Sequence, residues 1–104
     1  MASTSQIPYH VEHNERHGQW EARLDADVLG FEKGAIIGYA SYDVDDEGVY
    51  FTHTVVRNEF GGQGIASAIV KAAFDHVVSE GKRKIVPICS FTADYLDKHP
   101  EYKR

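Results

Sequence analysis

One glycine-rich stretch organises this sequence: Arg57-Asn58-Glu59-Phe60-Gly61-Gly62-Gln63-Gly64-Ile65-Ala66. The run before it, Val49–Val56, is rich in the β-branched and aromatic residues that favour strands. After it, apolar residues recur at helical spacing to about Ser79, and Gly81 suits the position just past a helix end. The pattern therefore predicts a strand, a glycine-rich turn and a helix that begins near Gln63.

The turn has the backbone chemistry of an anion site. Three of the four residues from Gly61 to Gly64 are glycines, which can adopt positive φ and let a ligand approach the backbone closely. The first N–H groups of a helix have no partner within it, and the helix dipole adds partial positive charge there. A phosphate or diphosphate suits such a position. A tight turn without any ligand explains the glycines equally well at this stage.

Two common phosphate motifs do not match. A P-loop carries Lys-Ser/Thr after its last glycine, where this chain has Ile65-Ala66. A dinucleotide fingerprint needs a third glycine where Ser67 stands, and an acidic residue that follows a second parallel strand. Glu80 lies near the required distance, but it falls at the end of the expected helix.

Composition places the chain among ordinary globular proteins. Its 104 residues suffice for one domain, expected over residues 1–104, and 42% hydrophobic content is a usual value. A net charge of −5 argues against a nucleic-acid partner. A single cysteine requires no oxidising compartment, and no apolar run reaches the roughly 18 residues that span a bilayer. We therefore expect a cytoplasmic protein with no membrane partner.

The remaining sequence predicts a mainly antiparallel sheet of about five strands. The expected strands are Tyr9–Glu15 and Gln19–Asp25 as a hairpin, then Ala35–Asp43, Val49–Val56 and Ile85–Ser90. The crossover between the last two should be parallel and right-handed. Pro87 cannot donate to a ladder, so it marks its strand as an edge or as splayed from its neighbour.

The ends of the chain and one acidic turn complete this prediction. Met1–Pro8 is expected to be disordered or loosely held. A short last helix is expected over Ala93–Lys98, capped by Ser90 or Thr92. The acids in the turn Asp45–Gly48 lack the spacing of a calcium-binding loop, so no metal site is expected.

The glycine turn resembles the acetyl-CoA diphosphate loop of the GCN5-related N-acetyltransferases, usually Gln/Arg-x-x-Gly-x-Gly/Ala. Gly64 and Ala66 match that pattern, and Gly61 replaces the usual Gln or Arg. Thr52-His53-Thr54 and the tail Val86–Tyr102 resemble a small subfamily of single-domain predicted acetyltransferases of the YjdJ type. The likeness is strong over residues 35–102. It implies a compact α/β (α+β) fold with one long helix after the fourth strand and a short C-terminal helix.

The resemblance implies transfer of an acetyl group from acetyl-CoA to an amine. In that family the fourth and fifth strands splay apart, and the pantetheine arm enters between them. By this likeness the residues expected to bind the cofactor are Thr54, Val55, Val56, Gly61, Gly62, Gln63, Gly64, Ile65 and Ala66. The basic run Lys82–Lys84 is a further candidate, for the adenosine 3′-phosphate, with a solvated helix end as the alternative.

Five side chains are candidates for the chemistry. His53 is the first candidate for the base, since histidine titrates near neutral pH, and Glu59 is the second. Cys89 is a candidate nucleophile that would form an acetyl-enzyme. Tyr95 and Tyr102 are both candidates for the proton donor to the leaving thiolate. Each also has a purely structural alternative, as a packed, buried or solvated side chain.

Two rival functions stay open from the sequence. Subfamily members lack much of the helical region and the last strands that usually form the substrate walls. A module that binds CoA or acyl-CoA without turnover is therefore one alternative, and a protein-interaction domain that uses the acidic surface is another. The acceptor amine is not identified, and the chain is expected to be a monomer or a homodimer.

Overall fold

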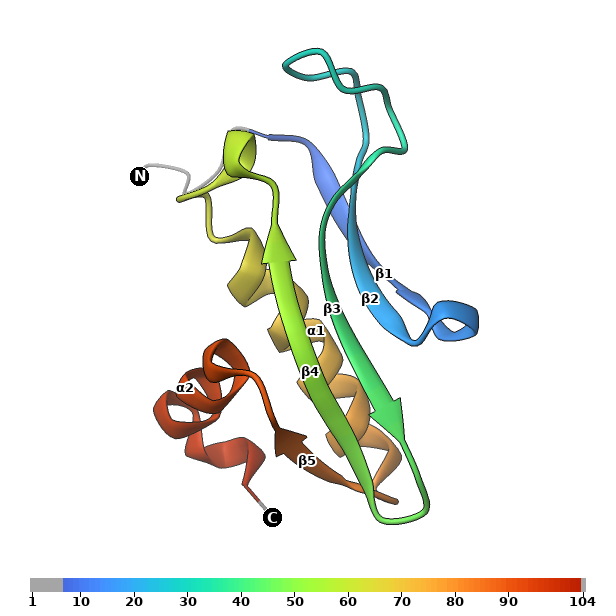
Figure 1. Cartoon of the computed structure of the whole chain (residues 1–104), viewed down its shortest axis with the longest axis vertical. Coiled ribbons are helices and arrows are strands. Elements are labelled where there is room, and N and C mark those ends of the chain that lie inside the picture. Colours follow the sequence, from blue (N-terminus) through green and yellow to red (C-terminus); the bar gives the residue numbers. More distant parts are fainter. Residues whose placement is uncertain (1–6, 104) are drawn as a thin grey trace.

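The computed structural model describes residues 7–103, which form one five-stranded sheet with two α-helices. The strands lie in the order β1-β2-β3-β4-β5, with antiparallel neighbours except for the parallel pair β4 and β5 (Figure 1). Their bounds are Tyr9–Asn14 for β1, Gln19–Leu24 for β2, Ile36–Val44 for β3, Gly48–Val56 for β4 and Lys84–Pro87 for β5. This is the predicted fold, and it confirms the parallel crossover after β4.

The two α-helices are α1, Ile65–Glu80, and α2, Ser90–Lys98. Residues 7–103 also contain three 3-10 turns: η1 (Glu15–His17), η2 (Asn58–Phe60) and η3 (Pro100–Tyr102). Gly81 ends α1 as predicted, with φ of 68° and its N–H bonded to the carbonyl of Val77 at 3.3 Å. The left-handed conformation at that position is one that glycine adopts without strain.

The structure corrects the predicted boundary between β5 and α2. β5 ends at Pro87 rather than Ser90, and α2 begins at Ser90 rather than Ala93. The N–H groups of Ile88 and Cys89 both donate to the carbonyl of Phe51 at 3.0 Å, so the chain leaves the ladder there. Cys89, with extended backbone, is the residue before the helix, and no side chain caps α2. The expected caps at Ser90 and Thr92 are therefore wrong.

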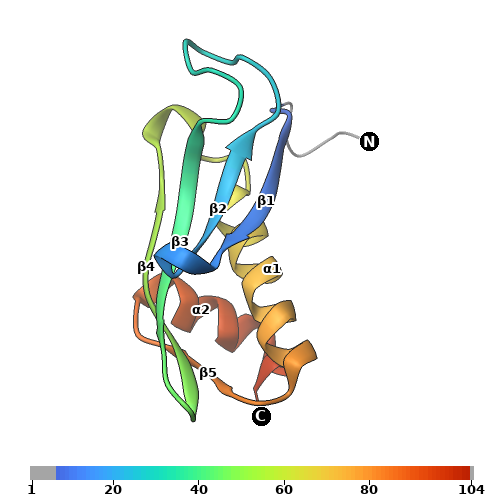
Figure 2. The same cartoon turned by 90° about the vertical axis from the view of Figure 1, so that its right-hand side faces the viewer.

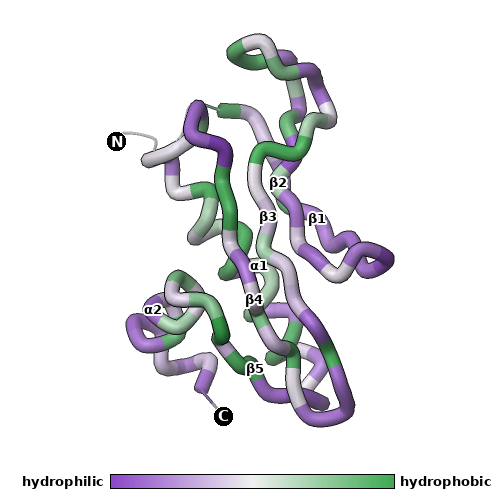
Figure 3. The backbone as a smooth tube through the Cα atoms, viewed as in Figure 1, coloured by the Kyte–Doolittle hydropathy of each residue, from purple (hydrophilic) through white to green (hydrophobic). Residues whose placement is uncertain are grey.

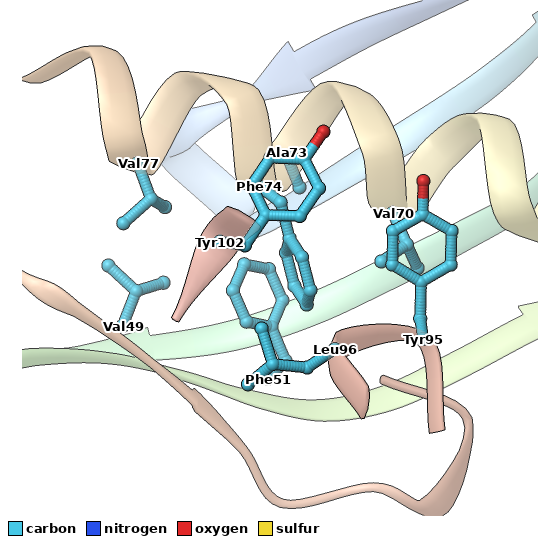
Figure 4. Packing of buried hydrophobic residues seen from close by; sticks show 9 residues of the cluster. All are labelled: Val49, Phe51, Val70, Ala73, Phe74, Val77, Tyr95, Leu96 and Tyr102. Atoms are coloured by element: carbon cyan, nitrogen blue, oxygen red, sulfur yellow. The ribbon is translucent and has the colours of Figure 1, made fainter. Parts of the chain in front are cut away.

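Both helices cover the same face of the sheet (Figure 2). One buried cluster joins β4 to α1 and α2, with the ring centroids of Phe51 and Phe74 5.2 Å apart and Tyr95 edge-on to Phe74 (Figure 4). A second cluster lies under the first half of α1; its members are Ala22, Leu24, Ile37, Ala40, Phe60, Ile65 and Ile69. Burial of each large side chain contributes about 2 kcal/mol, so these clusters hold α1 firmly on the sheet.

The opposite face of the sheet has no helix on it within the described residues. Its most buried group is the carboxylate of Glu21, which accepts hydrogen bonds from Asn14, Gln19 and Arg23 at 2.7 to 3.0 Å. These partners lower the pKa of Glu21 despite the opposing effect of its burial. On this face, hydrogen bonds between polar side chains therefore link the residues of β1 and β2.

Residues 7 and 8 are anchored to the rest of the fold, whereas the turn between β3 and β4 is polar. The disorder expected for Met1–Pro8 concerns mainly residues 1–6, which lie outside the described residues. Ile7 packs on the second cluster, and Pro8 accepts a hydrogen bond from the N–H of Asp25 at 2.9 Å. The turn between β3 and β4 is hydrophilic (Figure 3). Neither described α-helix has the length and apolar character needed to cross a membrane.

Candidate active site

The C-terminal half of β4, Thr52–Val56, has an open edge. β5 pairs only with Gly48–Phe51, and the chain then turns away into α2 (Figure 1). Within the described residues, no strand pairs with Thr52–Val56 on that side. A bulge also occurs here, since Ser41 faces His53 and Tyr42 faces Phe51, which leaves Thr52 as an extra residue of β4. The splay predicted from Pro87 is thus a feature of the fold.

The bulge determines which backbone groups of β4 face the open edge. The N–H of Arg57 donates to the carbonyl of Ile37 in β3, at 2.9 Å. Because antiparallel ladders alternate, the backbone groups of Val55 also face β3, and those of Thr54 and Val56 face away from it. Two of the three residues predicted to contact pantetheine therefore present their N–H and C=O groups to the gap, and Val55 does not.

The glycine turn presents several unused N–H groups. The N–H of Gly61 donates to the carbonyl of Asn58 at 3.1 Å. Among the described residues, no backbone acceptor meets the N–H groups from Gly62 to Ser67. Gly62 and Gly64 have φ of 74° and 77°, and Gly64 is the residue before α1. The glycine turn and the first residues of α1 thus expose a run of N–H donors at the positive end of the helix dipole.

Open space surrounds the two left-handed glycines. A side-chain carbon built on Gly62 or Gly64 would have no other atom within 4 Å. Positive φ, rather than crowding, is what favours glycine at both positions. Ile65 is buried in the second cluster and fixes the start of α1, while Gln63 and Ala66 are half-buried. The predicted anion site therefore consists of backbone, held by one apolar anchor.

Cys89 lies between two threonine hydroxyls. Its Sγ is 3.4 Å from the Oγ1 of Thr54 on β4 and 3.1 Å from the Oγ1 of Thr92 on α2. Thr92 is fully buried and also donates to the carbonyl of Cys89 at 3.0 Å. The thiol is half-buried. The site thus places a sulfur, two hydroxyls and the N-terminus of α2 beside the open edge of β4.

The surroundings of Cys89 favour its thiolate. Burial raises the pKa of the thiol, but its hydrogen bonds with the hydroxyls of Thr54 and Thr92 and with the N–H groups of Thr92 and Phe91 outweigh burial. The pKa of Cys89 consequently lies below its ordinary value. No cation is needed for this effect. The sequence indicated Thr92 only as a possible cap of the last helix and not as a partner of Cys89, although its spacing of three residues from Cys89 is the spacing of a local side-chain to backbone contact.

His53 is not beside Cys89. The side chain of Thr54 faces Cys89, and successive side chains of a strand alternate, so His53 lies on the face without helices. There its Nδ1 is 3.5 Å from the Oγ of Ser41. Glu59 lies in η2, exposed, just before the glycine turn. The structure therefore separates the two candidate bases from the candidate nucleophile.

The two candidate tyrosines belong to the core. The ring of Tyr95 stacks on His99 with centroids 4.0 Å apart, and burial raises the pKa of Tyr95. Tyr102 donates from its hydroxyl to the carboxylate of Asp75 at 2.5 Å. Burial and this hydrogen bond raise the pKa of Tyr102 far above its ordinary value. Tyr102 is thus held as a structural contact between η3 and α1.

The basic run Lys82–Lys84 lies at the far end of α1 from the glycine turn. The helix has 16 residues, which corresponds to about 24 Å. Lys82 and Lys84 line a hollow beside the turn between β3 and β4, and Arg83 donates from Nε to the carbonyl of Asp45 at 2.6 Å. The run therefore lies far from the glycine turn, and its contact with the adenosine 3′-phosphate stays a prediction.

Comparison with known proteins agrees with this geometry. A family profile described as GCN5-related N-acetyl-transferase matches residues 19–104. Protein NATD1 of Bos taurus is 33% identical over 93 residues, which cover 89% of this chain and 76% of that protein. Protein NATD1 of Homo sapiens is 32% identical with the same coverage, and that of Xenopus tropicalis is 32% identical over 90 residues.

Proposed function

The chain belongs to the GCN5-related N-acetyl-transferase family, and from this premise we propose that it binds acetyl-CoA and transfers the acetyl group to an amine. One observation carries the proposal. The unused N–H groups from Gly62 to Ser67 and the open edge of β4 at Thr54 and Val56 occur together, in the order that a diphosphate and a pantetheine arm require.

The diphosphate is assigned to the glycine turn. The N–H groups of Gly62, Gln63 and Gly64 and those of the first turn of α1 donate to its oxygens, and the helix dipole adds to the attraction. The side chain missing at Gly61 changes little, because the donors are backbone groups. Open space around Gly62 and Gly64 leaves room for the ligand.

The pantetheine arm is assigned to the open edge of β4. Its two amides would pair with the outward N–H and C=O groups of Thr54 and Val56, much as an added strand pairs with a sheet edge. Val55 would contribute through its side chain, which is 44% exposed. This course would bring the thioester to the region between Thr54 and Cys89.

Direct attack is the first route. The amine nitrogen attacks the thioester carbonyl, the C–N bond forms, the C–S bond breaks and the CoA thiolate takes up a proton. A backbone N–H of the open edge of β4 that the pantetheine amides leave free would stabilise the oxyanion. We assign the removal of the amine proton to His53 or Glu59, and the proton donor to Tyr95.

An acetyl-enzyme is the second route, and the lowered pKa of Cys89 favours it. The Cys89 thiolate would attack the thioester, release CoA and pass the acetyl group to the amine. Mass spectrometry after brief exposure to acetyl-CoA distinguishes the routes. A single acetyl on Cys89, absent in Cys89→Ala, supports the covalent route; unmodified Cys89 in an enzyme that turns over supports direct attack.

A CoA-binding module without turnover is the second candidate function. The observation behind it is the sheet face on which no described helix lies, since an acceptor would meet few walls there. Titration with acetyl-CoA, followed through the amide signals of residues 61–67, tests binding for both functions. Release of free thiol over a panel of amines then separates them. Amide signals unmoved by millimolar acetyl-CoA would contradict both.

A further inference from the structure

A pocket of about 480 Å³ lies at the C-terminal half of α1, away from the glycine turn. β1, β2 and β3 supply one wall and α1 supplies the other, and the turn after β1 supplies part of the rim. Its principal side chains are His13, Trp20, Tyr42, His76, Glu80 and Arg83. We call it the tryptophan pocket, since it contains the only tryptophan of the chain.

The wall of the tryptophan pocket is aromatic and rigid. His13 and Trp20 face each other across β1 and β2, with ring centroids 4.2 Å apart and planes within 4°. The Nε2 of His13 is 2.6 Å from the hydroxyl of Tyr42. The ring of His76 lies edge-on to His13, with centroids 5.2 Å apart. Stacking and hydrogen bonding thus fix these rings in place before any ligand binds.

The charges around the tryptophan pocket are mainly negative. Glu15, Asp43 and Glu80 line it, against the single guanidinium of Arg83, which already donates to the carbonyl of Asp45. Burial and the nearby His76 lower the pKa of His13, so this ring is neutral at neutral pH. Burial raises the pKa of Tyr42, and the negative charges of Glu15 and Glu80 raise it further. Both carboxylates therefore lie close enough to the aromatic wall to interact with it electrostatically.

We propose that the tryptophan pocket binds a small organic cation of the alkylammonium class. Trp20 and Tyr42 line the pocket, and aromatic rings attract a cation through their π-electrons, although His13 covers one face of Trp20. Glu15 and Glu80 supply the opposing charge. The volume is in the range of small-molecule sites. An apolar neutral molecule would gain nothing from three carboxylates, and an anion would be repelled by them.

This pocket is separate from the proposed diphosphate site. His76 comes eleven residues after Ile65, which corresponds to about 17 Å along α1. The buried cluster around Phe51 and Phe74 fills the space between the helix and β4. Trp20 pairs with Ala40, and Ala40 pairs with Thr54, so the pocket lies two strands away from Thr54 on the sheet. The inference rests on the pocket's own residues, and it does not depend on acetyl transfer.

The test uses the fluorescence of Trp20, which reports directly on the pocket because the chain has no other tryptophan. The full chain is titrated with choline, and in parallel with its neutral isostere 3,3-dimethylbutan-1-ol, at constant ionic strength set with sodium chloride. We expect choline to give a saturable change with a dissociation constant of about 1 to 10 mM. The isostere should give no saturable change.

Charge variants complete the test. The double variant Glu15→Gln/Glu80→Gln keeps the shape of the pocket and should weaken choline binding about threefold to tenfold. The control Glu32→Gln/Glu101→Gln removes the same charge from two exposed residues elsewhere and should leave binding unchanged. The proposal is overturned if choline gives no saturation up to about 50 mM, if the isostere binds as well, or if both double variants weaken binding equally.

Discussion

The Oγ1 of Thr54 lies 3.4 Å from the Sγ of Cys89, although 35 residues separate them in the sequence. The contact forms because β5 ends at Pro87 and the chain bonds twice to the carbonyl of Phe51 before α2 begins. Cys89 is thereby held at the point where the open edge of β4 begins. Thr92 completes the arrangement from the first turn of α2.

Thr92→Val should raise the pKa of Cys89. The variant keeps the buried shape of Thr92 but removes the hydroxyl 3.1 Å from the sulfur, and hydrogen bonds to an ionised group are among the stronger ones. We expect the pKa of the thiol to rise toward its ordinary value, measured as the midpoint of the iodoacetamide alkylation rate against pH. Thr52→Val is the control, because its hydroxyl contacts Ser41 instead. An unchanged midpoint in Thr92→Val would contradict this role.

The order of elements was predictable from the sequence, because its local patterns are strong. The β-branched run before the glycines, the helical spacing from Ile65 to Val77 and the glycine at position 81 predicted β4, the turn and α1. The run Pro87-Ile88-Cys89-Ser90-Phe91 was more difficult, because its apolar residues also fit a strand. Its conformation depends on the carbonyl of Phe51, a contact between distant residues that no local pattern contains.

The candidate site was predictable from the sequence only where its binding groups are backbone N–H groups. Glycines at 61, 62 and 64 indicated exposed N–H groups without any knowledge of the tertiary structure. The contact of Cys89 with Thr54, and the placement of His53 on the other face, depend on the bulge at Thr52 and on where α2 packs. A strand bulge reverses which side each later residue faces, and the sequence carries no clear signal for it.

Gly64→Ala should weaken acetyl-CoA binding beyond its effect on stability. Gly64 has φ of 77° and open space around it, so alanine costs about 1 kcal/mol of unfolding free energy through backbone strain alone. Gly30→Ala is the matched control, since Gly30 has φ of 83° and equally open surroundings in a distant loop. Urea unfolding should show similar losses in both variants. Only Gly64→Ala should also raise the dissociation constant for acetyl-CoA; equal affinities in the two variants would contradict the assignment of the diphosphate.

Tyr102→Phe should destabilise the protein in a way that depends on pH. The hydroxyl of Tyr102 and then Lys71 lower the pKa of Asp75 in the folded state. A depressed carboxyl pKa contributes stability above the unfolded value, and this contribution is lost as the pH falls through the folded value. Because Asp75 is half exposed, we expect a loss of only about 1 kcal/mol at pH 7. Urea unfolding should show the variant and the parent converging as the pH falls below about 4, the ordinary aspartate pKa. A difference that stays constant with pH would mean that packing, not the hydrogen bond, accounts for it.

Lys98→Ala and Lys82→Ala should differ in their effect on the adenosine 3′-phosphate. Lys98 lines a small hollow with Ser67, in the first turn of α1, whereas Lys82 lies beyond the other end of that helix. Each variant removes one exposed ammonium group, so the pair is matched in charge. We expect Lys98→Ala to weaken the binding of CoA about threefold while leaving that of 3′-dephospho-CoA unchanged, as measured by calorimetry. Lys82→Ala should alter neither affinity.

A loss of CoA affinity in Lys82→Ala alone would mean that the cofactor's tail runs along α1 toward its C-terminal end. The assignment of the diphosphate to the glycine turn would then have to be abandoned.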